Sequence, residues 1–250
     1  MGVREETLEL LHQGLSPKEI AREKGVNIKT TLAYLDQLVG RGDLRRSDIF
    51  FTLPKDIREA VGAVANPIRW GLTTTDTARK FLKSVGSNAG EEDIIVAIKY
   101  GDARHALGDM YEDIRAIETF LHNLIRENLM EIYGEGELEW WRKGIPLSIR
   151  QSCQSRREQD EEPVEDPYCY TDLLDLWQIL DKQWKVLKKV LPNDITADKQ
   201  ALRLNLIRLN AIRRKVMHPV RGVIPSEDDF EFIREFKKPL LNTTGEESID

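Results

Sequence analysis

One stretch, residues 198–222, constrains the fold of this chain more than any other. It reads DKQALRLNLIRLNAIRRKVMHPVRG. On a helix, with about 100° between successive residues, its apolar side chains fall on two opposite faces. The first face carries Leu202, Leu206, Leu209, Ile212 and Val216, and the second carries Leu204, Ile207 and Ala211. A helix with two apolar faces is expected to be covered on both. We therefore predict a bundle helix whose second face packs against a neighbouring element or a second subunit.

The charge of this stretch is opposite in sign to the net charge of the whole chain. From Lys199 to Ser226 there is no acidic residue, although the whole chain has a formal net charge of -6. The seven basic residues of this segment are Lys199, Arg203, Arg208, Arg213, Arg214, Lys215 and Arg221. Such a local reversal of sign indicates an anionic partner.

Two residues near the end of this helix are candidates for chemistry. Pro219 disfavours helical geometry for the residue before it, so His218 should lie at the C-terminal edge of the helix. The helix dipole favours positive charge there, which keeps a proton available on the imidazole. Arg213 lies about 20° from Leu202 on the helical wheel, where a charge is costly to bury without a partner. Glu118, in the apolar register of an earlier segment, is a candidate partner, either as a structural ion pair or as an orienting group.

The segments before this helix complete a helical series. Residues 111–133 and 170–191 have the apolar period of amphipathic helices. Between them lie EWWRKGIP at 139–146 and the charged segment SRREQDEEPVEDP at 155–167. In order and spacing, this series resembles the Swt-type branch of the HEPN superfamily over roughly residues 109–238. The resemblance implies an up-and-down helical bundle.

Arg213 and His218 match the Arg and the His of the RNase-type HEPN motif, whereas the next position of the motif, usually polar and often Asn, is Arg214 here. The resemblance implies a metal-independent endoribonuclease without a cofactor. In such an enzyme a ribose 2′-hydroxyl attacks its own phosphodiester and leaves a 2′,3′-cyclic phosphate. His218 would move protons and Arg213 would stabilise charge on the phosphate. The implied RNA-binding residues are Asn210, Arg214, Lys215 and Arg221, with Glu118 orienting Arg213.

One histidine cannot readily act as base and acid on opposite sides of the same phosphorus. HEPN ribonucleases are known as dimers that bring two motifs together, and the second apolar face of residues 198–217 offers a surface for this. We therefore expect a homodimer with a composite site. A subunit held by a partner in a toxin–antitoxin or phage-defence system is an alternative.

Residues 1–53 carry the signals of a helix-turn-helix. After a first helix at 3–13, Ser16, Pro17 and Glu19 form a capping box that opens a second helix. Gly25-Val26-Asn27 then forms the turn to a third helix. Arg45–Thr52 is expected to form a strand of a wing. The whole resembles the winged helix-turn-helix units of bacterial regulators and of some helicases.

This N-terminal unit is expected to bind DNA. Residues 15–46 hold seven basic and four acidic side chains, which leaves a net charge of +3. The predicted DNA contacts are Asn27, Lys29, Thr30 and Thr31 at the start of the third helix and Arg45 and Arg46 in the wing. Contact with another protein is the alternative role for this unit.

The complete chain is predicted to be mostly α-helical, because only 7% of its residues are aromatic and 32% are charged. The expected domains are a winged helix-turn-helix at 1–53, a helical connector at 54–108 and an HEPN-like bundle at 109–238. Residues 239–250 are polar and acidic and are expected to be a disordered tail.

Composition excludes several other classes. Cys153 and Cys169 define no disulfide framework, and the sequence has no Cys/His spacing for zinc. The two cysteines therefore favour a reducing, cytoplasmic setting. No segment reaches the eighteen or so apolar residues that a membrane span needs, so we expect a soluble protein without a membrane anchor. The competing function is a noncatalytic DNA-binding regulator that dimerises through its bundle. In that interpretation, which Arg214 favours, Arg213 and His218 are structural.

Overall fold

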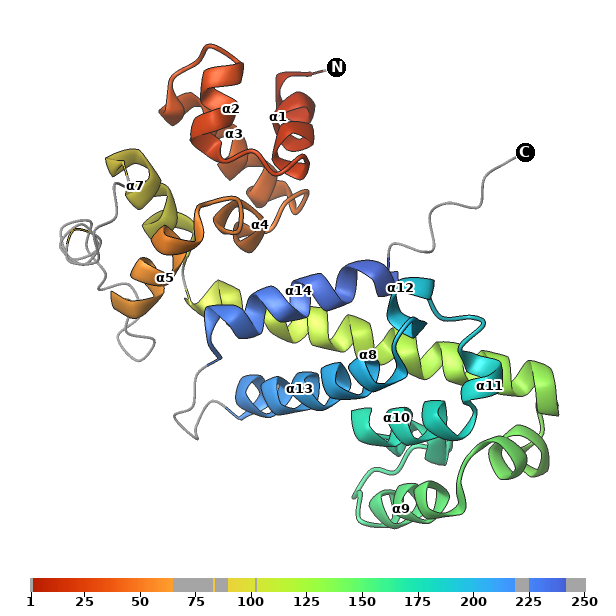
Figure 1. Ribbon diagram of the computed structural model, residues 1–250. Coiled ribbons are helices and arrows are strands. Elements are labelled where there is room, and N and C mark those ends of the chain that lie inside the picture. The colour runs from red at the N-terminus through yellow and green to blue at the C-terminus, as the bar shows by residue number, and fades with distance from the viewer. Residues whose placement is uncertain (1, 65–82, 84–89, 102, 219–224, 242–250) are drawn as a thin grey trace, which may run out of the picture. The chain divides into compact units, whose positions relative to one another are not determined.

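The structure is a computed structural model that describes residues 2–64, 83, 90–101, 103–218 and 225–241 (Figure 1). Every regular element in these ranges is a helix, so the predicted mostly α fold is confirmed. The chain divides into two compact units, Met1–Met110 and Tyr111–Asp250.

The first unit begins with three helices that pack on one another. Its helices are α1 (Val3–His12), α2 (Pro17–Glu23), α3 (Ile28–Arg41), α4 (Arg46–Phe50), α5 (Lys55–Val64) and α7 (Glu91–Tyr100). The predicted capping box opens α2, because the Ser16 amide donates to Oε2 of Glu19 at 2.8 Å and the Glu19 amide donates to Oγ of Ser16 at 3.4 Å. The turn into α3 passes through Gly25 at φ 61°, a backbone angle that glycine adopts without strain.

The helix α7 belongs to the core of this unit. Ile94, Val96 and Ala97 are at most 2% exposed and lie in the same apolar cluster as Leu35 of α3. The Tyr100 hydroxyl donates to Asp36 on α3 at 2.9 Å. Burial raises the pKa of this phenol, and its hydrogen bond to Asp36 adds to the effect. The described part of the expected connector therefore packs onto the N-terminal helices as part of the first unit.

The predicted wing strand at Arg45–Thr52 is wrong. The segment forms α4, which begins where the Arg45 amide donates to the Asp48 carboxylate at 3.1 Å. Ile49 is fully buried, and Leu53 is 3% exposed after the helix ends. A carboxylate at the third helical position satisfies an N-terminal amide that a lone strand would leave without a partner.

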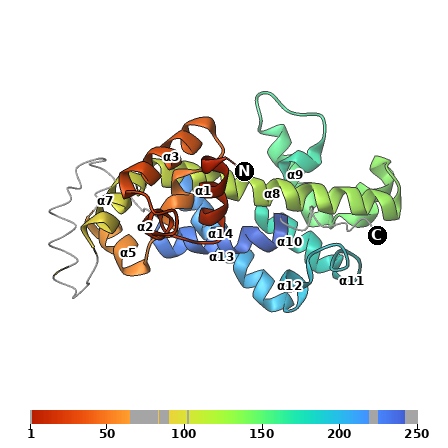
Figure 2. The same cartoon turned by 90° about the horizontal axis from the view of Figure 1, so that it is seen from above.

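The second unit is a helical bundle around the rest of α8. Its elements are α8 (Ala103–Tyr133, which starts in the first unit), the π-helix η1 (Glu137–Gly144), α9 (Leu147–Glu158), the 3-10 helix η2 (Pro167–Tyr170), α10 (Leu173–Lys182), α11 (Trp184–Leu187), α12 (Asn193–Thr196), α13 (Lys199–Met217) and α14 (Glu227–Leu241). Figure 1 shows α13 and α14 running alongside α8. Seen from above, α9 and α12 lie on opposite sides of α8 (Figure 2).

One predicted helix of the bundle is interrupted. Residues 170–191 form α10 and α11 in place of one continuous helix, with a break at Gln183 (φ -98°, ψ 18°). The Gln183 side chain donates to the Gly144 carbonyl at 2.7 Å and accepts from the Tyr133 hydroxyl at 3.2 Å. These tertiary hydrogen bonds hold Gln183 at the point where the chain changes direction.

The predicted helix of residues 198–217 is confirmed, and so is its division into two faces. Asp198 caps α13 by accepting from the amides of Gln200 and Ala201 at 2.8 and 3.1 Å. Leu202, Leu206, Leu209 and Ile212 are at most 2% exposed, whereas Leu204 and Ile207 are 55% and 44% exposed. The second apolar face is therefore an exposed patch on the single chain.

The C-terminal boundary differs from the expectation. Helix α14 continues to Leu241 and buries Leu240, so residues 239–241 are part of the bundle and not of a tail. Residues 242–250 lie outside the described part of the chain.

We expect Leu206→Ala to lower the free energy of unfolding by about 2–5 kcal/mol, because it removes a fully buried side chain and leaves a cavity. The matched change Leu204→Ala, on the exposed face of the same helix, should change it by less than about 0.5 kcal/mol at concentrations where the protein is monomeric. Urea unfolding followed by circular dichroism measures both. Equal effects of the two variants would contradict this assignment of the faces.

Candidate functional site

The candidate site centres on an ion pair between two helices of the bundle. Nε of Arg213, on α13, lies 2.9 Å from Oε1 of Glu118, on α8. The two side chains are 35% and 23% exposed. This is the partner that the apolar register of α8 suggested for Arg213.

Arg213 is held on one side and open on the other. Its Nε is buried, while the side chain as a whole is 35% exposed, so the exposed surface belongs to its other atoms. A guanidinium group has five N–H donors in a planar fork, and a pair through Nε leaves donors for a second acceptor. Nε meets the Glu118 carboxylate as a charge contact and not as an aligned hydrogen bond. The ion pair therefore places the guanidinium beside Glu118 without sealing it beneath the bundle.

The position of Glu118 in the bundle disfavours the ionised form of its carboxyl group. Its pKa is raised, because burial disfavours the carboxylate, although the nearby charge of Arg213 acts in the opposite direction. The contact with Arg213 therefore offsets only part of the effect of burial on this carboxyl.

His218 occupies the position that Pro219 predicts. It is the residue that ends α13, with φ -127° and ψ 61°, and it is exposed. No hydrogen bond joins it to Arg213 among the described residues. The structure thus brings Arg213 and His218 to the same end of α13 but shows no direct contact between them.

The predicted RNA-binding residues around this pair differ in availability. Arg214 is exposed and Asn210 is half-buried. Lys215 donates to Asp229 of α14 at 2.7 Å. Although burial acts to raise it, the pKa of Asp229 is lowered by hydrogen bonds from Lys215 and from the Ser226 amide. Lys215 is therefore engaged within the chain, and Arg221 lies outside the described residues.

The predicted DNA contacts on α3 need one correction. Thr31 is fully buried, so it cannot contact DNA. Asn27 caps the helix, because its Oδ1 accepts from the Lys29 amide at 2.9 Å. The Lys29 side chain is exposed and Thr30 is half-buried. Lys29 is therefore the best placed of the four for a phosphate.

The two arginines that were expected in a wing are half-buried and engaged within the first unit. Nε of Arg45 lies 3.5 Å from the carboxylate of Asp48. Arg46 donates to the carbonyl oxygen of Lys99 on α7 at 3.1 Å. Arg45 is thus engaged at the start of α4 itself, and Arg46 joins α4 to α7. A DNA contact would have to use the donors that remain.

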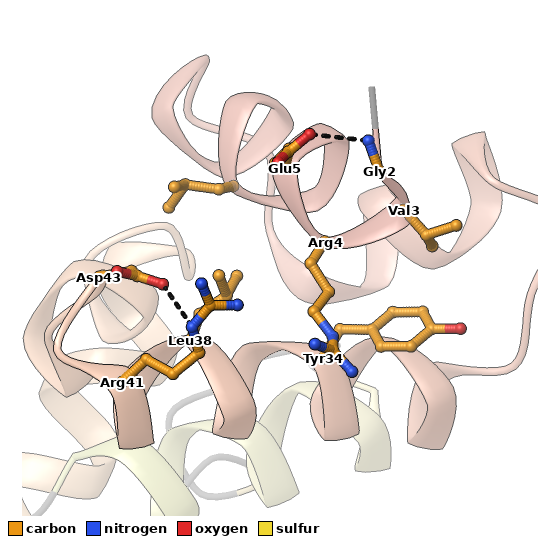
Figure 3. A pocket seen from close by; sticks show the side chains of 9 residues that line it. Gly2, Val3, Arg4, Glu5, Tyr34, Leu38, Arg41 and Asp43 are labelled. Atoms are coloured by element: carbon orange, nitrogen blue, oxygen red, sulfur yellow. Dashed lines mark hydrogen bonds and ion pairs between the residues drawn. The ribbon is translucent and has the colours of Figure 1, made fainter.

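Two cavities were not anticipated from the sequence, and neither contains Arg213 or His218. One, of about 410 Å³, lies between α1 and α3 and is lined by Gly2, Val3, Arg4, Glu5, Leu8, Tyr34, Leu38, Arg41 and Asp43 (Figure 3). The second, of about 550 Å³, lies between α10 and α13 and is lined by Trp177, Asp181, Lys199, Gln200 and Arg203. Each combines segments that are distant in sequence. The one available signal was Lys199 and Arg203, one helical turn apart in the basic run.

Comparison of the chain with family models, with curated proteins and with solved structures gave no match. Among the described residues, no group of three or more His, Cys, Asp and Glu side chains is arranged to hold a metal ion. None of the described helices has both the length and the apolar character to cross a bilayer. The fold and the site define a helical two-unit protein with an Arg and a His at one end of a basic helix.

We expect Glu118→Gln to change how stability depends on pH. The native pKa of Glu118 is raised, so this carboxyl adds stability below its unfolded pKa of about 4.3, and that stability is lost as pH rises through the native pKa. The free energy of unfolding of the unaltered chain minus that of Glu118→Gln should therefore fall as pH rises above about 4 and then level off.

Urea unfolding at a series of pH values between about 4 and 8 measures this difference. Glu112→Gln is the matched control, because Glu112 lies on the same helix and pairs with Arg115 in an exposed position. A difference for Glu118→Gln that does not change with pH would contradict the prediction.

Proposed function

We propose that this protein is a metal-independent endoribonuclease of the HEPN type, with an N-terminal unit that binds nucleic acid. The observation that carries the proposal is the arrangement of Arg213, which Glu118 holds through Nε while the side chain stays 35% exposed. An arginine fixed in this way has little freedom to lose when a phosphate binds. His218 lies exposed at the end of the same helix.

The proposed reaction is a transesterification within the RNA. A base takes the proton of a ribose 2′-hydroxyl, the 2′-oxygen bonds to the adjacent phosphorus, and the bond from phosphorus to the 5′-oxygen breaks. An acid donates a proton to that leaving oxygen. Arg213 stabilises the negative charge that builds up on the phosphoryl oxygens, and His218 serves as one of the two proton-transfer groups.

The second proton-transfer group would come from a second copy of the chain. Leu204 and Ile207 are 55% and 44% exposed on the face of α13 that points away from the core. Burying this face in a two-fold interface would remove apolar surface from water and supply the partner subunit's His218. An antitoxin or a defence-system protein is the other occupant that this face suits.

We expect the protein to cleave single-stranded RNA in excess EDTA and to leave 2′,3′-cyclic phosphate ends. His218→Ala should reduce the rate by at least about 100-fold, because it removes a proton-transfer group. The rate per chain should also fall on dilution if the site is composite. Gel electrophoresis of a labelled RNA, with mass spectrometry of the products, measures cleavage.

His12→Ala is the matched control for the histidine variant, since His12 is also exposed and ends α1 in the other unit. Circular dichroism checks that both variants are folded. Unchanged cleavage by His218→Ala, or activity that disappears on chelation, would refute the mechanism.

A noncatalytic DNA-binding regulator is the second candidate function. The position after Arg213 is Arg214 and not the polar residue typical of the motif, and the Arg213–Glu118 contact also serves as an ion pair between two helices. In this alternative α13 supplies the dimer interface, and Lys29 at the start of α3 contacts a DNA phosphate.

We expect the full chain to bind duplex DNA with an affinity that falls steeply with salt, because phosphate contacts release counterions. Lys29→Gln should lower the steepness of the log–log salt dependence by about 0.9, the value for one phosphate contact on duplex DNA. Fluorescence anisotropy with a labelled duplex measures this. Arg115→Gln, an exposed charge on α8, is the control. If Lys29→Gln and Arg115→Gln have the same affinity and salt dependence, Lys29 does not contact DNA. Contact with another protein would then be the role of the N-terminal unit.

A further inference from the structure

The cavity between α10 and α13 lies at the opposite end of α13 from His218. It has a volume of about 550 Å³ and is lined by Trp177, Asp181, Lys199, Gln200 and Arg203. Arg203 lies fifteen residues before His218, which corresponds to about 22 Å along the helix axis. The cavity is therefore separate from the candidate site at the C-terminal end of α13.

Lys199 is held across this cavity by an exposed ion pair. Its Nζ lies 2.7 Å from the Asp181 carboxylate on α10, and the two side chains are 39% and 54% exposed. The ammonium group also lies 5.2 Å from the ring centre of Trp184. A pair exposed to this degree contributes little to stability, so an arriving anion is able to share or replace Asp181. An ammonium group has three donors, and the pair uses one of them.

Arg203 adds a second cation to the cavity. It lies four residues after Lys199, so the two side chains project from the same side of α13. Arg203 is exposed and forms no ion pair or hydrogen bond among the described residues. The nearest acid in sequence, Asp198, is already engaged as the helix cap, where it accepts from two amides. The cavity lining therefore has one positive charge in excess, carried by a guanidinium that has no acceptor.

The remaining two lining residues suit a nucleotide better than an acidic protein segment. Trp177 is 9% exposed and offers an aromatic surface within the cavity, and the exposed Gln200 offers an amide that both donates and accepts hydrogen bonds. Single-stranded nucleic acid is recognised by this combination of cations for the phosphate with aromatic and amide groups for the base.

We infer that this cavity binds one nucleotide of the RNA strand, with its phosphate between Lys199 and Arg203 and its base against Trp177 and Gln200. The inference rests on the proposed function for the identity of the strand as RNA. It adds a binding site about 22 Å from His218, so an RNA that is long enough contacts α13 at both ends.

The test measures binding in the full chain that carries His218→Ala, so that the RNA stays intact whether or not the unaltered chain cleaves it. A labelled single-stranded RNA of about twelve nucleotides is titrated by fluorescence anisotropy at several salt concentrations. Arg203→Gln should weaken binding by about tenfold and lower the steepness of the log–log salt dependence by about 0.7, the value for one phosphate on a single strand. Arg142→Gln is the control, because Arg142 is exposed on η1 and loses the same charge.

A loss that is specific to Arg203→Gln supports the inference, even if the unaltered chain proves to have no ribonuclease activity. Equal losses for Arg203→Gln and Arg142→Gln would overturn it, since RNA would then be responding to the total charge of the unit. No loss for either variant would also overturn it. Poly-glutamate that competes as well as RNA at equal charge, and depends equally on Arg203, would reassign the cavity to an acidic protein partner.

Discussion

The burial of one face of α13 determines which side chains of this helix lie on the surface of the second unit. Leu202, Leu206 and Leu209 are at most 2% exposed, and each buried leucine contributes about 1.5–3 kcal/mol of transfer free energy. Rotating the helix by about half a turn would expose this face and bury Leu204 and Ile207 in its place. The core therefore sets the rotation of α13, and the rotation decides which side chains face water.

Arg213 lies within the angular range of that buried face, between Leu202 and Leu206 on the helical wheel, but near the C-terminal end of α13. A guanidinium that was fully buried would need full compensation for its lost hydration. The Arg213 side chain stays 35% exposed and has one carboxylate, Glu118, as its partner. A second pair, Lys237 with Asp113 at 2.6 Å, lies deeper, because the Asp113 side chain is only 1% exposed. The two pairs join α8 to α13 and to α14, but only Arg213 comes close to the exposed end of α13.

Long periodic segments were predictable from the sequence, because several turns of a helix repeat the same signal. The helices α8 and α13 are of this kind, and the two faces of α13 could be read from their spacing alone. The segment of α4 was misread as a strand because five residues are too few to separate the two periods. Its capping carboxylate, Asp48, was the signal that would have corrected the assignment.

Other features depend on contacts that no local pattern contains. The apolar period of residues 170–191 continues through Gln183, yet the chain breaks there because its side chain bonds to Gly144 and Tyr133. The cavity between α10 and α13 depends on residues 183–198, which include α11 and α12 and return the chain to the side of α10. Thr31 is a different case, since it lies four residues before Leu35 on the buried face of α3, and its burial could have been read from that spacing.

Most of the basic residues on α13 already have partners within the chain, so fewer of them are available to bind an anion than their number suggests. Lys199 and Lys215 pair with Asp181 and Asp229, Arg213 pairs with Glu118, and Arg208 donates to the Asp228 carbonyl at 3.1 Å and lies over the Phe232 ring. Arg203 and Arg214 are the two basic residues in the described part of α13 that form no such contact. They lie eleven residues apart, or about 16 Å, and within about 20° of each other on the helical wheel.

The two free guanidinium groups therefore flank one edge of the exposed apolar face that Leu204 and Ile207 form. A phosphate backbone that followed this edge would meet positive charge at both ends, and the apolar face beside it would stay available for a second subunit. The proposed dimerisation and the proposed binding of a nucleic acid strand would thus use adjacent surfaces of one helix. Because the buried face fixes the rotation of α13, it fixes the orientation of both surfaces.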